Sequence, residues 1–168
     1  DLVEVEWMRF YHRPDWAVPV ITDFARESQT FRRYRMDDVV KLSGACGCAT
    51  PFQRVGAVGG RLQDILLLPA PKGGFRPLFP FEVNAVLKGF ADYRLYQQDA
   101  YHFTLAVPGA PGRGVLAALT ELLERPSRLE IVPLRAEAPE KKRRRVQRLF
   151  DEGNSVVLES LVGPPGGM

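Results

Sequence analysis

The chain of 168 residues is poor in the residue types that build metal sites and many catalytic sites. It has only two cysteines and two histidines: Cys46, Cys48, His12 and His102. These are too few and too scattered to complete a four-ligand zinc site. A glycine-rich phosphate loop, a Ser-His-Asp set and paired catalytic carboxylates are also missing. No metal site is therefore predicted, and buried structural cysteines in a tight turn are the preferred interpretation of Cys46 and Cys48.

Long apolar runs are also lacking. No run approaches the roughly 18 residues that a membrane-spanning helix requires, so no membrane association is predicted. The first residues, Asp1–Glu4, have neither the basic start nor the apolar stretch of a signal peptide. Together with the scarcity of cysteine, this predicts a cytoplasmic protein. The chain does not start with Met, which favours a start inside a longer polypeptide.

Charge is nearly balanced, with a net charge of +3, and the excess is local. Lys141 to Arg145 are five consecutive basic residues, and the rest of the chain is close to neutral. Phosphate contacts from Lys141–Arg148 to a nucleic acid are one interpretation of this run. Aromatic residues are not interleaved with it, apart from Phe150, so stacking on single strands is disfavoured. A nucleic-acid partner is not expected.

The first part of the chain has the pattern of β-structure. Val3, Val5 and Trp7 alternate with glutamates, which is typical of a half-buried strand. Further strands are predicted over residues 17–22 and 31–42, the latter interrupted by its charged pair, and a glycine-rich turn over 43–51. This predicts a β-rich segment over residues 1–60.

Residues 61–150 have a different pattern. A short apolar run over 65–68 predicts a buried strand, and a Pro/Gly loop follows over 69–77. Apolar residues at i, i+4, i+7 and i+8 predict a helix from Phe79 to Leu87, and a second helix is predicted over 115–123. Strands are expected at 93–98, 102–107 and from 129. The order predicts a small α+β sandwich with helices on one face, followed by a tail over 151–168 that is disordered from Gly163.

Two stretches pair a guanidinium with a carboxylate at the end of a strand-like run, namely Arg33–Asp38 and Gly60–Asp64. Together with Pro19–Phe24, Ser28–Arg35 and the Cys46–Cys48 turn, they resemble the C-terminal part of the phenylacetate–CoA ligase-like branch of the adenylate-forming (AMP-forming acyl-CoA synthetase) superfamily. The match covers residues from about Val18 to Arg148.

The resemblance implies an α+β fold: the β-rich end of a large N-terminal domain, followed by a small α/β sandwich that acts as a lid. It also implies a two-step reaction. A carboxylic acid attacks the α-phosphate of Mg²⁺-bound ATP to form an acyl-adenylate, and a thiol, usually coenzyme A, then displaces AMP. ATP or AMP, Mg²⁺ and coenzyme A are thus the implied cofactors.

Residue by residue, Asp38 matches the acid that accepts hydrogen bonds from both ribose hydroxyls, and Arg61 matches the arginine at the hinge between the domains. Tyr34 and Arg35 belong to the same nucleotide-binding motif. A carboxylate offers two acceptor oxygens, and the planar guanidinium fork suits oxygen anions. Asp37 departs from the motif, which usually has a small residue there. The alternative is that Asp38 and Arg35 form only a surface ion pair.

The resemblance further implies a lysine that neutralises charge on the α-phosphate. Lys142 is the best candidate and Lys141 the second, although the glycine of the motif is missing before them. The alternative is a solvated basic run on the surface. Gln63 replaces a carboxylate that is frequent at the hinge; rotation there needs backbone freedom rather than charge.

The sequence therefore predicts the C-terminal portion of an ATP-dependent aryl acid–CoA ligase-like enzyme. The alternative is a degenerate adenylating domain that serves as a non-catalytic binding or scaffold module. The phosphate loop and acyl pocket of the family lie in its N-terminal region, so this chain alone is predicted to be inactive. An N-terminal adenylation core or a partner chain is the expected partner, besides the acid and the nucleotide. Members of the branch are frequently dimeric, which makes a homodimer a further expectation.

Overall fold

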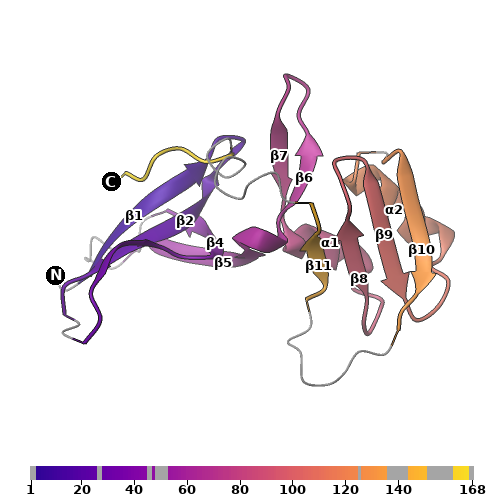
Figure 1. Cartoon of the computed structure of the whole chain (residues 1–168), viewed down its shortest axis with the longest axis horizontal. Helices are drawn as coiled ribbons and strands as arrows, with labels where there is room; N and C mark the ends of the chain where they lie inside the picture. Colours follow the sequence, from indigo (N-terminus) through magenta and orange to yellow (C-terminus); the bar gives the residue numbers. More distant parts are fainter. Residues whose placement is uncertain are drawn as a thin grey trace. The chain divides into compact units, whose positions relative to one another are not determined.

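The computed structural model describes residues 3–25, 28–44, 47, 53–124, 126–135, 144–150 and 161–166. The chain divides into two compact units. The first consists of Asp1–Leu62 with Gly153–Met168, and the second of Gln63–Glu152. Figure 1 labels the helices and strands of the two units.

The first unit is built on an antiparallel sheet in which β1, β2, β4 and β5 follow one another and β3 also pairs with β2. Its strands are β1 (Val3–Phe10), β2 (Arg13–Asp23), β3 (Phe31–Arg35), β4 (Asp38–Ser43) and β5 (Arg54–Arg61). One edge of β2 pairs with β1, and the other pairs first with β4 and then with β3. The run predicted over 31–42, with an interruption at its charged pair, thus forms two strands, β3 and β4. The run breaks at Met36, whose N–H donates to the carbonyl of Pro19 at 2.9 Å.

The C-terminal end of the chain returns to this sheet. Val162 and Gly166 form isolated bridges with Phe10 and Trp7 of β1. The N–H of Tyr11 donates to the carbonyl of Leu161 at 2.9 Å. The prediction of disorder from Gly163 is wrong for residues 163–166, because their backbone groups pair with β1 whatever their composition.

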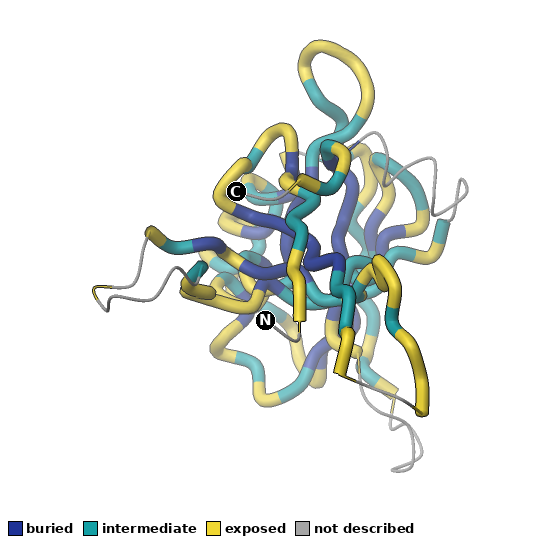
Figure 2. The backbone as a smooth tube through the Cα atoms, turned by 90° about the vertical axis from the view of Figure 1, so that its left-hand side faces the viewer, coloured by how far each residue is buried: buried dark blue, intermediate teal, exposed yellow. Residues whose placement is uncertain are grey.

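The second unit contains a four-stranded sheet in the order β10-β9-β8-β11 and a two-stranded hairpin of β6 and β7. Its elements are η1 (Leu62–Asp64, which begins in the first unit), β6 (Leu66–Pro69), β7 (Phe75–Leu78), α1 (Pro80–Leu87), β8 (Arg94–Gln97), β9 (His102–Val107), α2 (Arg113–Leu122), β10 (Arg128–Pro133) and β11 (Val146–Arg148). The turn between β6 and β7 is exposed and stands at the top of Figure 2. The loop predicted over 69–77 is thus a hairpin whose second strand was missed.

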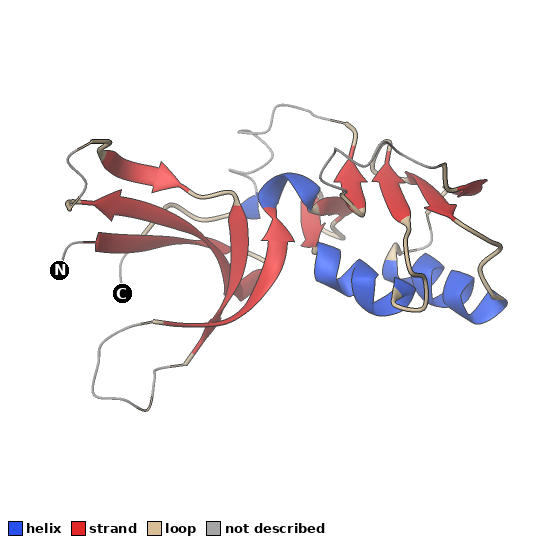
Figure 3. Cartoon of the chain, turned by 90° about the horizontal axis from the view of Figure 1, so that it is seen from below, coloured by secondary structure: helices blue, strands red, loops and turns tan. Residues whose placement is uncertain are grey.

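Both helices cover one face of the four-stranded sheet, as predicted (Figure 3). Val83 and Leu87 of α1 and Leu119 of α2 are buried in one core with Phe103 and Leu105 of β9. Helix α1 begins at Pro80, whose missing N–H is no loss in a first turn. The carboxylate of Glu82 accepts from the N–H of Phe79 at 2.9 Å and satisfies a donor at the same end. The predicted fold class, a β-rich α+β chain, is confirmed.

A buried glutamine joins β8 to β6. Gln97 is fully buried. Its side-chain amide donates to the carbonyl of Leu67 at 2.7 Å, and its Oε1 accepts from the N–H of Leu67 at 2.9 Å. β6 and β8 belong to different sheets. The side chain of Gln97 therefore makes the two hydrogen bonds to Leu67 that a neighbouring strand would otherwise make with its backbone.

Gln97→Leu is expected to lower the free energy of unfolding by about 2–6 kcal/mol, because it leaves two buried backbone groups without partners at about 1–3 kcal/mol each. Urea denaturation measures the change. Gln98→Leu is the matched control: Gln98 is exposed and donates to the hydroxyl of Thr104 at 2.5 Å. Equal unfolding midpoints for the two variants would show that the hydrogen bonds of Gln97 to Leu67 do not stabilise the fold.

Candidate nucleotide-binding site

The structure brings Asp38 and Arg61 together at the end of two neighbouring strands. Asp38 is the first residue of β4 and Arg61 the last of β5, and the two are directly paired in the antiparallel register. Side chains of directly opposed residues project from the same face, with Cβ atoms about 4.5–5.5 Å apart. Both residues are half-buried. The two residues therefore lie side by side on the strand pair, although 22 residues separate them in the sequence.

Two glycines set this register. Gly60 has a φ of 123°, a conformation that favours glycine. The pairing shifts between Val39, opposite Gly60, and Val40, opposite Val58, so Gly59 is the extra residue of a bulge. A Cβ on Gly59 would lie 2.5 Å from a ring carbon of the buried Trp16. The N–H of Leu62 then donates to the carbonyl of Asp37 at 2.7 Å and closes this end of the strand pair.

Tyr34 and Arg35 lie on β3, opposite Ile21 and Val20 of β2. Consecutive strand residues point to opposite faces, so their side chains diverge. Tyr34 is 55% exposed, and its ring packs edge-on against that of Phe31 with centroids 5.3 Å apart. Their predicted part in nucleotide binding stays a prediction.

The lysine candidates, Lys141 and Lys142, lie outside the described residues, as do Cys46 and Cys48. The described residues resume at Arg144. Arg144 donates from Nη1 to Oε1 of Gln63 at 3.1 Å, and the same nitrogen is 3.5 Å from Oδ1 of Asp64. Sequence reasoning treated this arginine only as part of a charge run, so it missed a contact to the turn that follows Arg61.

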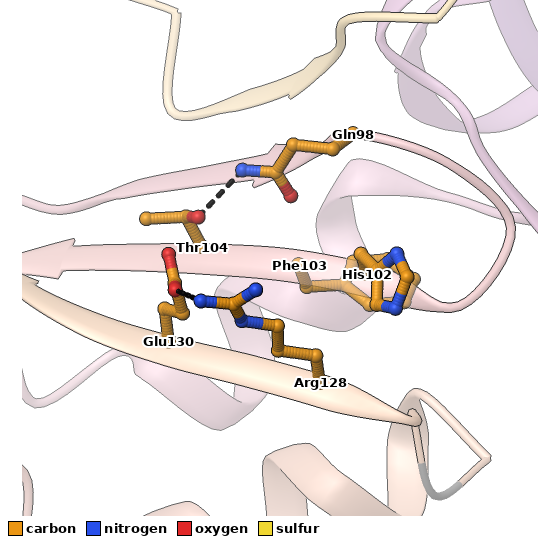
Figure 4. Close-up of a pocket in the computed structure, with 6 residues that line it drawn as sticks. All are labelled: Gln98, His102, Phe103, Thr104, Arg128 and Glu130. Carbon is orange, nitrogen blue, oxygen red and sulfur yellow. Dashed lines mark hydrogen bonds and ion pairs between the residues drawn. The ribbon is translucent and has the colours of Figure 1, made fainter.

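The second unit has a separate polar depression of about 290 Å³, lined by Gln98, His102, Phe103, Thr104, Arg128 and Glu130. Figure 4 shows that its polar groups point toward one another: Arg128 pairs with Glu130, and Gln98 with Thr104. Nδ1 of His102 lies 2.6 Å from Oδ2 of Asp99. The backbone N–H of Tyr101 and then the His102 ring lower the pKa of Asp99. The charged and polar side chains of this depression already pair with one another or with the adjacent Asp99. Asp38 and Arg61 therefore form the better candidate site.

Among the described residues, no group of three or more His, Cys, Asp or Glu side chains could hold a metal ion. In the same part of the chain, no helix has the length and apolar character needed to cross a membrane.

No protein-family model matches this sequence, and no curated protein sequence matches it either. Solved structures do match, and the two described next are of a CoA ligase. An open conformation of 2-hydroxyisobutyryl-CoA ligase, in complex with 2-HIB-AMP and CoA, has 20% identity and a TM-score of 0.51, and covers 90% of this chain and 37% of its own. The same ligase in the postadenylation state, in complex with R3-HIB-AMP, has 19% identity and a TM-score of 0.56, and covers 95% of this chain and 39% of its own.

The chain therefore has the fold of the C-terminal region of an adenylate-forming enzyme, and the predicted resemblance is confirmed at the level of the fold. It spans less than two-fifths of the length of the ligase structures that it matches.

Proposed function

We propose that this chain is the C-terminal portion of an ATP-dependent carboxylate ligase that forms an acyl-adenylate and then a thioester. The observation that carries the proposal is the direct pairing of Asp38 with Arg61, in a fold shared with 2-hydroxyisobutyryl-CoA ligase. On this proposal, residues 1–60 complete the adenylation core and residues 61–150 form the lid.

Each residue has a chemical role in the proposed reaction. The two oxygens of Asp38 accept the hydrogen bonds of the ribose hydroxyls, and the guanidinium of Arg61 binds the ribose and phosphate side of the nucleotide. Lys142, or else Lys141, neutralises the charge that develops on the α-phosphate as the acid attacks it and pyrophosphate leaves. Coenzyme A then attacks the acyl carbon, and AMP departs. The described residues offer no cluster of Mg²⁺ ligands, so Mg²⁺ would be held by the nucleotide phosphates and the rest of the enzyme.

A non-catalytic binding module is the second candidate. Two departures favour it: Asp37 adds a like charge beside Asp38, and Gln63 replaces a hinge carboxylate while its side chain is occupied by Arg144.

The isolated chain is expected to release no pyrophosphate from ATP with any of a panel of aryl acids, because it spans only part of the matching ligases and carries no phosphate loop. The complete protein, with its adenylation core, is expected to release pyrophosphate with at least one acid. A coupled pyrophosphate assay on both forms makes the comparison. Turnover by the isolated chain would show that this chain does not need an N-terminal adenylation core for activity. Absence of turnover from the complete protein would favour the non-catalytic module.

A further inference from the structure

The described end of the basic run makes specific contacts with the protein, although Arg144 and Arg145 are exposed. Arg145 donates from Nη2 to the carbonyl of Ala91 at 3.2 Å, and its guanidinium lies 5.5 Å from the centre of the Tyr93 ring. Burial raises the pKa of Tyr93 to about 12, against the opposing charge of Arg145, so this ring stays neutral at physiological pH. Arg148 donates from Nη1 to the carbonyl of Ile65 at 3.2 Å.

Two of these arginines bind one short segment. Arg144 contacts Gln63 and Asp64, and Arg148 contacts the next residue, Ile65. Arg144 lies just before β11 and Arg148 ends it, and their contacts show that both side chains reach the same segment. Their three contacts cover three consecutive residues that begin two positions after Arg61. The side chain of Asp64 is only 15% exposed, so its ion pair with Arg144 is shielded from water on one side.

The strand β11, which follows Arg144 and Arg145 and ends at Arg148, is itself held by hydrogen bonds. β11 pairs with β8 in parallel, and the N–H of Leu95 donates to the carbonyl of Arg145 at 2.8 Å. The N–H of Leu149 donates to the carbonyl of Gln97 at 2.8 Å. Gln97 is the buried residue that also holds β6. The segment 63–65 is thus attached to the rigid sheet of the second unit through Arg144 and Arg148.

We propose that Arg144 is a positioning residue for the adenylation step: it fixes the turn after Arg61 to the strand that follows the lysine segment. The inference rests on the proposed function. Nη1 of Arg144 faces both the amide oxygen of Gln63 and the carboxylate of Asp64, so one charged group contacts two neighbouring residues of the turn. Lys142 precedes Arg144 by only two residues in the sequence, so we expect loss of the attachment to leave the candidate lysine less restrained for its proposed role. A displacement of about 1 Å costs on the order of 100-fold in rate.

The test compares Arg144→Gln with the wild type in the complete protein. The kcat of acid-dependent pyrophosphate release is expected to fall about 10- to 100-fold, with the KM for ATP within about twofold, because the nucleotide contacts are untouched. Arg144→Lys is expected to restore part of the rate, since it keeps the charge that faces Asp64. Arg128→Gln is the matched control: Arg128 pairs with the nearby Glu130 on β10, and its side chain is 67% exposed.

Amide hydrogen exchange supplies a readout that does not need activity. Arg144→Gln is expected to speed exchange in residues 62–66, and Arg128→Gln is not. Unchanged exchange together with unchanged kcat would overturn the inference. So would a selective rise in the KM for ATP or coenzyme A, because it would make Arg144 a ligand-binding cation instead. An inactive wild type would refute the proposed function alone, and the exchange result would still show whether Arg144 holds the turn.

Discussion

Replacing Asp38 with Ala in the complete protein is expected to weaken AMP binding about 100- to 10,000-fold. The carboxylate is proposed to accept two charge-assisted hydrogen bonds from the ribose, and such bonds contribute about 1.5–3 kcal/mol each. Isothermal titration with AMP measures the change, and the loss of the AMP-dependent thermal shift provides a second readout. The effect should be confined to affinity, since Asp38 begins its strand at a half-exposed position and its removal leaves no cavity.

Asp15→Ala is the matched control for this experiment. Asp15 lies on β2 of the same sheet, is 49% exposed, and forms an ion pair with Lys41 at 3.7 Å. Its replacement should leave the affinity for AMP within about twofold, because exposed pairs contribute at most about 1 kcal/mol and Asp15 is not part of the candidate site. If the wild type binds AMP and Asp38→Ala binds it equally well, Asp38 is not the ribose acceptor. If the complete wild type does not bind AMP at all, the non-catalytic module is favoured.

Lys142→Ala is expected to slow acyl-adenylate formation by about 100- to 1,000-fold, the usual loss when a group that stabilises transition-state charge is removed. Binding of AMP should be unchanged, since Asp38 and Arg61 are proposed to hold the nucleoside. Thioester formation from a pre-formed acyl-adenylate should also be nearly unchanged, because the α-phosphate is no longer under attack in that step. Single-turnover assays of each half-reaction separate these expectations.

The neighbouring lysine offers an internal control. Lys141→Ala carries the same loss of charge and length, one residue earlier in the sequence, and is expected to keep adenylation within a few-fold of the wild-type rate. The opposite result, with Lys141→Ala as the damaging change, would transfer the role to Lys141. A normal rate of adenylation in both variants would show that neither lysine acts on the α-phosphate and that both belong to a solvated basic run on the surface.

The elements that could be predicted were those with a strong period and a local cause. The spacing of Phe79, Val83 and Leu87 and the proline after Phe79 predicted α1, and alternation over 102–107 predicted β9. β7 was missed because Pro77 and two neighbouring glycines are typical of a loop; its strand character comes from pairing with β6. The interruption within 31–42 was predicted from its charged pair, but the stretches of β2 that β3 and β4 pair with were not, because alternation does not report pairing.

The candidate site was found only in part, for a related reason. The identities of Asp38 and Arg61 are visible in the sequence, but their pairing depends on a bulge whose position follows from the packing of Trp16 against Gly59. Gln97 and Arg144 look like solvent-facing polar residues when only their neighbours in sequence are considered. Their partners, Leu67, Gln63 and Asp64, are 30 or more residues away along the chain. No local pattern reports such contacts.

The return of residues 161–166 to β1 has a mechanical consequence. The first unit contains both ends of the described chain, so the second unit is an insertion joined to it by two covalent crossings, near residues 62 and 152. A domain on one linker can swivel about a single bond, whereas a domain on two must move about an axis that both connections allow. If the second unit reorients between half-reactions, as the proposed function requires, the second crossing narrows the set of available rotations. The second connection would then restrict the directions in which the second unit can rotate. Its length would help to set how far that unit can move.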